Sequence, residues 1–105
     1  MLKAAEVGSI GEKYATAWLT ANGYKCHRNT QLPGATDIEA TSANHSLLVQ
    51  VKTAIYPNLA AGLTPDDKRA IVGRANKNQR EAWLAQLQIN SEGELVGKIT
   101  WAKLN

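Results

Sequence analysis

Three polar residues lie in two neighbouring segments that otherwise alternate like β-strands. Asp37 lies in TDIEAT, and Gln50 and Lys52 lie in LLVQVKT. Side chains alternate across a strand, so Gln50 and Lys52 share one face. If the short link SANH closes a hairpin, the polar faces of the two strands coincide and bring Asp37 near the other two residues.

These residue types could bind a metal ion together with a phosphate. A carboxylate and an amide oxygen can both hold a hard divalent cation, and a lysine beside them can bind an anion. The alternative is solvated polar residues on the outer face of a sheet. Mg²⁺ is usually bound by one or two carboxylates, so a second acid would help. Glu12 is a candidate because it borders the apolar stripe of an expected helix beside the small residues Gly8 and Ala15; an ordinary surface glutamate is the alternative.

A helix is expected from Lys3 to Asn22. Its apolar residues recur at steps of three or four, and Asn22 with Gly23 supplies the stop. The stripe consists of Val7, Ile10, Tyr14, Trp18 and Ala21.

Five strands and a second helix are expected after this helix. Three strands cover residues 24–30, 36–41 and 47–53, with the turn QLPGA between the first two. TPDD is typical of a helix start, and this second helix should end near Asn78. EAWLAQLQIN and ELVGKITW, separated by SEG, indicate a second hairpin. The order is helix, three strands, helix, two strands.

The segments GEKYATAWLTANGY, LPGATDIEA and LLVQVKTA together resemble the core of the restriction-endonuclease-like, or PD-(D/E)XK, nuclease superfamily. The resemblance implies an α/β (α+β) fold of order αβββαββ, with a central mixed sheet flanked by helices, in one domain over residues 1–105. The family motif pairs an aspartate on one strand with an acid, a spacer and a lysine on the next. Carried over, Asp37 matches the aspartate, Gln50 the second acid, Lys52 the lysine and Glu12 a glutamate from the first helix.

This sequence departs from the family motif at two positions. Thr36 precedes Asp37 where the family has proline. Gln50 replaces an acid, which removes a negative charge from the metal site and should weaken cation binding. A QxK version occurs in active members of the superfamily, so the substitution does not imply an inactive enzyme, but it makes Glu12 more necessary.

The resemblance implies a Mg²⁺-dependent DNA endonuclease, with Mn²⁺ as a substitute ion. Asp37, Gln50 and Glu12 would hold the metal, which lowers the pKa of a bound water. Lys52 would orient or deprotonate that water, or stabilise the charge of the transition state. A Holliday-junction-resolvase-like enzyme and a small site-specific or homing endonuclease both fit, acting as a homodimer or higher homo-oligomer. The alternative is a noncatalytic DNA-binding or assembly module that retains the fold.

The net charge of the chain favours an anionic partner. The chain has 105 residues and a formal net charge of +3, which favours nucleic acid or acidic surfaces. On the expected second helix, Arg69, Arg74 and Lys77 form a basic side that could contact phosphates; a solvated face is the alternative. A single cysteine and no apolar run of membrane-spanning length favour a cytoplasmic protein without a membrane partner.

Several other residues are set outside the candidate site. Glu39 shares the face of Asp37 and is either an auxiliary ligand or solvated. His27 and His45 are not spaced as a zinc pair and are expected at the surface. The three tryptophans are expected to pack in the core or at an interface rather than to stack on bases; they are Trp18, Trp83 and Trp101.

Overall fold

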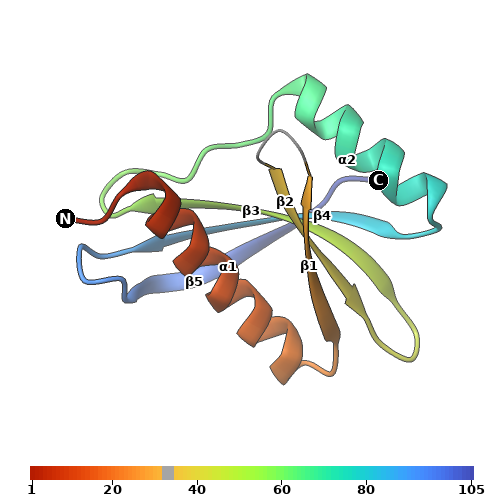
Figure 1. Ribbon diagram of the computed structural model, residues 1–105, viewed down its shortest axis with the longest axis horizontal. Helices are drawn as coiled ribbons and strands as arrows, with labels where there is room; N and C mark the ends of the chain where they lie inside the picture. Colours follow the sequence, from red (N-terminus) through yellow and green to blue (C-terminus); the bar gives the residue numbers. More distant parts are fainter. Residues whose placement is uncertain (32–34) are drawn as a thin grey trace.

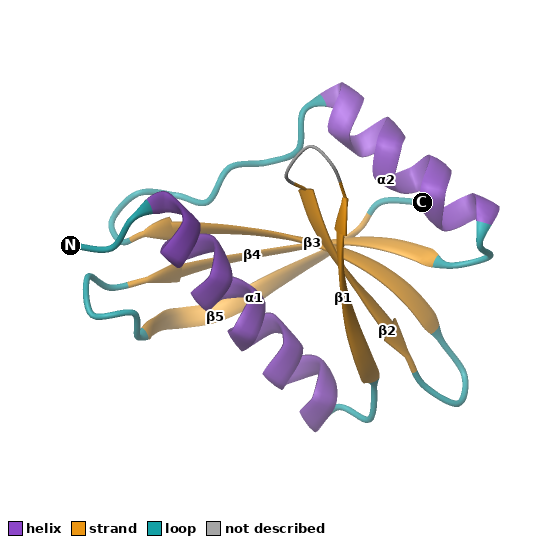
Figure 2. Ribbon diagram, viewed as in Figure 1, coloured by secondary structure: helices purple, strands orange, loops and turns teal. Residues whose placement is uncertain are grey.

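The protein is an α+β structure in which one five-stranded sheet carries a helix on each face (Figures 1 and 2). The computed structural model describes the backbone of residues 1–31 and 35–105 and the side chains outside residues 29–37. The elements are α1 (Ala4–Ala21), β1 (Lys25–Gln31), β2 (Ala35–Thr41), β3 (Ser46–Ile55), α2 (Pro65–Lys77), β4 (Glu81–Ile89) and β5 (Leu95–Lys103). The order and type of the expected elements are confirmed. The centre of the QLPGA turn lies outside the described residues.

The sheet has the order β1-β2-β3-β4-β5 and is mixed. β1, β2 and β3 pair antiparallel, β3 and β4 pair parallel, and β5 returns antiparallel beside β4. Parallel strands need a long crossover connection, and α2 with its preceding loop supplies it between β3 and β4. The two hairpins expected from the links SANH and SEG are both present.

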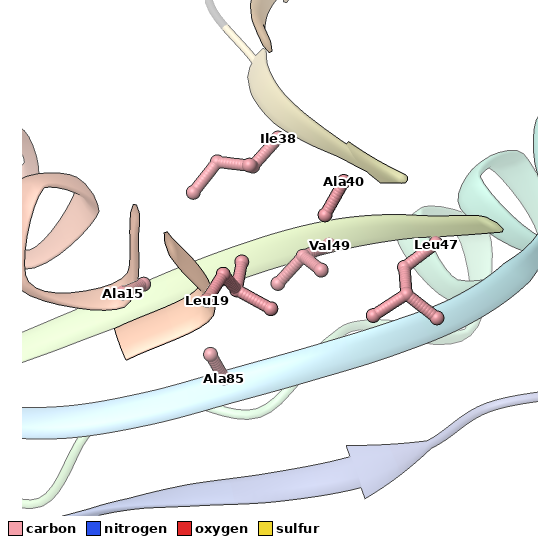
Figure 3. Close-up of a cluster of buried hydrophobic side chains, with 7 residues drawn as sticks. All are labelled: Ala15, Leu19, Ile38, Ala40, Leu47, Val49 and Ala85. Atoms are coloured by element: carbon pink, nitrogen blue, oxygen red, sulfur yellow. The ribbon is translucent and has the colours of Figure 1, made fainter. Parts of the chain in front are cut away.

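Helix α1 covers the face of the sheet that carries Val49 of β3. Ala15 and Leu19 pack there against Ile38, Val49 and Ala85 (Figure 3). We call this the α1 face, and the opposite face the outer face. Odd-numbered residues of β3 and β4 point to the α1 face, since side chains alternate along a strand.

The expected apolar stripe of α1 is confirmed in part, because Val7 is buried and Ile10 and Tyr14 pack against its cluster, but the stripe that faces the sheet is rotated around the helix. The buried residues recur every fourth position, at Val7, Gly11, Ala15 and Leu19, whereas Trp18 is 44% exposed. Gly11 explains the difference, because a Cβ at this position would lie 1.8 Å from the Thr53 hydroxyl oxygen. The smallest side chains therefore face the sheet and let the helix approach it closely, and the bulky Trp18 is displaced to the margin.

Helix α2 packs on the outer face near the start of β3, at Leu48. Ile71 and Ala75 contact Leu48 and Ala82 in a second cluster. The Thr64 hydroxyl caps the helix by accepting a hydrogen bond from the Asp67 amide at 3.1 Å, as the TPDD pattern predicts. Neither described helix is long and apolar enough to cross a membrane.

Candidate active site

The structure brings Asp37, Gln50 and Lys52 onto adjacent strands. Asp37 of β2 is the direct antiparallel partner of Gln50 of β3, and Lys52 follows two positions later. Gln50 and Lys52 share the parity of Leu48, which packs against α2, so they belong to the outer face. The side chain of Asp37 lies outside the described side chains, and its placement rests on the backbone register alone.

A loop after β3 lies on the same outer face beside Lys52. In the parallel β3–β4 ladder the partner of Lys52 is Gln86. The Gln86 side-chain amide donates hydrogen bonds to the carbonyl oxygens of Ala61 at 2.9 Å and Ala60 at 3.4 Å. The loop of residues 56–63, which joins β3 to α2 (Figure 2), is therefore bound to β4, one strand away from the lysine. We call this loop the strap.

Glu12 is not grouped with the other three candidates. Helix α1 lies on the α1 face, and the Glu12 carboxylate accepts a hydrogen bond from the Arg28 guanidinium of β1 in an ion pair. Arg28 is the ladder partner of Ile38 and thus shares its face. The glutamate is mostly buried beside the sheet, while about two fifths of the arginine side chain is exposed.

The metal-binding capacity of the site rests on oxygen donors. Among residues with described side chains, no group of three or more His, Cys, Asp or Glu is placed to hold a metal ion. The Asp37–Gln50 pair offers one carboxylate and one amide oxygen at directly paired ladder positions. This donor set suits Mg²⁺, which retains several waters and uses few protein ligands. Glu12 lies on the opposite face of the sheet from Gln50 and Lys52, so it would have to leave Arg28 and change its position to reach the same metal ion.

The three basic residues assigned to DNA binding lie on α2. Arg69 and Lys77 are exposed and Arg74 is partly buried. Arg69 pairs with Asp66 one helical turn earlier, so its charge is partly offset within the helix. Arg74 and Lys77 fall in the last turn, where cations are favoured by the helix dipole.

Glu39 has a structural contact. Its carboxylate lies 3.2 Å from the Arg80 guanidinium, which also donates a hydrogen bond to the Leu47 carbonyl oxygen at 3.2 Å. This contact ties β2 to the segment between α2 and β4 and favours the structural interpretation of Glu39 over the ligand interpretation. Both histidines are exposed, as expected.

The tryptophans line a hollow at the far end of α1. Trp18 and Trp101 have ring centroids 4.7 Å apart at 38°. Trp83 borders the same hollow of about 350 Å³. Trp83 and Trp101 pack against the core cluster on the α1 face, so the expectation of core packing holds for these two, while Trp18 is exposed.

Cys26 is not an activated nucleophile. Burial raises the pKa of its thiol, and a hydrogen bond with Thr20 lowers it by a smaller amount. The thiolate, which is the reactive form, is therefore disfavoured near neutral pH.

The sequence-based prediction missed Arg28 and Gln86. Arg28 follows Cys26 by two residues, so alternation would have placed both side chains toward α1. Gln86 and Gln88 break the apolar alternation of WLAQLQI on one face, which signals a partner on that face.

The comparisons agree with this architecture at the level of fold. No family model and no curated protein matches the chain. The chain folds as a mixed sheet flanked by helices. It is similar to the solved structure of Archaeoglobus fulgidus Hjc, a Holliday junction resolvase from an archaeal hyperthermophile, with a TM-score of 0.69 and 20% sequence identity over 92% of this chain and 72% of that chain. The fold expected from the family resemblance is thus confirmed.

Proposed function

We propose that this protein is a metal-dependent DNA endonuclease that hydrolyses phosphodiester bonds. The observation that carries the proposal is the register of β2 and β3, which pairs Asp37 with Gln50 and places Lys52 two residues further on the same face as Gln50. This arrangement reproduces the aspartate, second ligand and lysine of the nuclease motif, in a fold similar to that of a Holliday junction resolvase.

Each proposed catalytic residue has a separate task. Asp37 and Gln50 would hold a Mg²⁺ or Mn²⁺ ion. Glu12 would become a third ligand by leaving Arg28 on the α1 face and moving toward the ion. The metal, when bound, supplies Lewis-acid polarisation of the phosphate and a water of lowered pKa. Lys52 would orient that water or stabilise the negative charge that develops on the phosphate oxygens.

The proposed substrate is DNA held by phosphate contacts. Arg69, Arg74 and Lys77 of α2 would contribute contacts that position the duplex without reading its sequence. A homodimer would present two sites to two strands. Junction resolution and site-specific cleavage are both compatible with these residues.

A second candidate function is a noncatalytic DNA-binding module, and the observation that favours it is Gln50 itself. An amide at this position brings no negative charge to balance a dication.

One experiment tests the endonuclease proposal and narrows its substrate. The protein would be incubated with plasmid, linear duplex and four-way junction DNA in Mg²⁺, in Mn²⁺ and in EDTA. We expect cleavage in either metal and none in EDTA, and the preferred DNA identifies the substrate class. Tight binding of these DNAs without cutting in either metal would favour the noncatalytic module.

A further inference from the structure

The strap presents apolar side chains to solvent over β4, one strand away from the proposed catalytic lysine. Leu59 is 85% exposed and Tyr56 is 57% exposed, and both are among the few large hydrophobic side chains that the described residues expose. An isolated exposed leucine is common at protein surfaces. Leu59 differs from such a residue because its backbone is anchored to the sheet on both sides.

The backbone of the strap is fixed to the outer face by side-chain amides. Gln86 donates to the Ala61 and Ala60 carbonyl oxygens, and the Gln88 amide donates to the Asn58 carbonyl oxygen at 2.8 Å. The Tyr56 amide also donates to the Ile89 carbonyl oxygen at 2.9 Å. These contacts bracket Leu59 on both sides. The leucine is therefore held outward by an anchored backbone, which reduces the entropy lost when it contacts a ligand.

The surroundings of the strap suit a polyanion. A hollow of about 270 Å³ separates the strap from β5, and its lining includes Lys98 and Thr100 but no carboxylate. On the other side, one strand from β4, lies Lys52. Gln86, which holds the strap, thus lies between Lys52 on β3 and the hollow that Lys98 lines, and cations and hydroxyl groups are typical phosphate contacts.

We propose that the strap is a DNA-contacting element, in which Leu59 packs against bases at an unstacked step next to the phosphate bound at Lys52. Leucine is one of the side chains that wedge between base steps in DNA-binding proteins. Lys98 and Thr100 hold the neighbouring backbone phosphates. This inference rests on the proposed endonuclease function and adds to it a preference for DNA with weakened stacking, such as a branch point or a nick.

The test measures base unstacking without cleavage. Duplex and branched DNA carrying the fluorescent base 2-aminopurine, which brightens on unstacking, would be titrated in Mg²⁺ with the Lys52→Ala protein, chosen to prevent cutting. This protein would be compared with two double variants that also carry Leu59→Ala or Leu59→Met. Leu59→Met is the matched control. Leu59 is mostly exposed, so all variants should melt at the same temperature.

On branched DNA, we expect the fluorescence to rise with the protein that retains Leu59 and with the Leu59→Met variant. The fluorescence should stay flat with the Leu59→Ala variant. The Kd of Leu59→Ala for branched DNA should be weaker by about tenfold, since one buried leucine contact is lost. Equal fluorescence and equal Kd across the variants would overturn the strap proposal while leaving the endonuclease proposal intact. Failure of every variant and of the wild type to bind DNA would overturn both. If Leu59→Ala instead converts a dimer to a monomer in sedimentation, Leu59 contacts a second copy of the chain and the strap proposal is wrong.

Discussion

Asp37 and Gln50 are direct partners across the antiparallel β2–β3 ladder. This pairing fixes the spacing of the proposed site through the backbone, independently of any flexible loop. A slip of one residue in this register would move every side chain of a strand to the other face. The apolar neighbours Ile38 and Val49, which are fully buried on the α1 face, oppose such a slip and thereby hold the polar pair in register.

Gln50→Glu should strengthen metal binding. The substitution restores the acid of the nuclease motif and places a negative charge beside the ion, which should lower the Mg²⁺ concentration for half-maximal cleavage by about tenfold. A Mg²⁺ titration of the cleavage rate measures this shift. An unchanged midpoint, with the fold intact by circular dichroism, would place Gln50 away from the metal.

Glu12→Gln should separate a catalytic role from a structural one. Glu12 is mostly buried, but its partner Arg28 is about two fifths exposed and a glutamine keeps an oxygen that can accept the hydrogen bond, so the substitution should cost under about 1 kcal/mol of the free energy of unfolding. If Glu12 is a metal ligand, the variant should require at least about tenfold more Mg²⁺ while its stability changes little. A large loss of stability with an unchanged metal requirement would assign Glu12 to packing alone.

Sequence patterns predicted most of the fold and only part of the site. Alternation and turn residues located the strands, and the SANH link predicted the hairpin that pairs Asp37 with Gln50. The predicted buried face of α1 included Trp18 and omitted Gly11, because hydrophobic periodicity counts large apolar residues and ignores glycine. In the structure the helix packs on the sheet through small residues such as Gly11 and Ala15. The ion pair of Glu12 with Arg28 and the anchoring of the strap by Gln86 depend on tertiary contacts between distant segments, which periodicity does not encode.

The close contact of α1 with β3 predicts opposite effects for two glycines of the same helix. Gly11→Ala would place its Cβ 1.8 Å from the Thr53 hydroxyl oxygen and 2.9 Å from the Thr53 Cβ, so the helix must shift, at a cost of about 1–3 kcal/mol. Gly8→Ala meets nothing within 4 Å and should stabilise the helix by about 0.5–1 kcal/mol. Urea unfolding of both variants measures the difference. Stabilisation by both substitutions would show that the helix is not in close contact at Gly11.

The contacts of the Glu81 carboxylate predict that the stability of the protein depends on pH. A hydrogen bond with His45, a second with Trp83 and the charge of Lys103 outweigh burial and hold the pKa of Glu81 below its ordinary value of 4.5. Because the pKa is lower in the folded state, the stabilisation is fully present above pH 4.5 and is lost as the pH falls through the folded value.

Glu81→Gln should therefore be less stable than the wild type at pH 7, by under about 1 kcal/mol for a surface cluster. The difference in the free energy of unfolding should shrink as the pH falls below 4.5. A difference that stays constant between pH 7 and pH 3 would contradict the assignment.

The rate of DNA cleavage by Lys52→Ala tests the proposed active site most directly. Lys25→Ala, at an exposed position of β1, removes the same charge elsewhere and serves as the control. In saturating Mg²⁺ and with excess protein over DNA, Lys52→Ala should cut at least about a hundredfold more slowly than the wild type, while Lys25→Ala cuts at the wild-type rate. Equal cleavage by Lys52→Ala and the wild type would contradict the central claim that this strand carries the catalytic lysine.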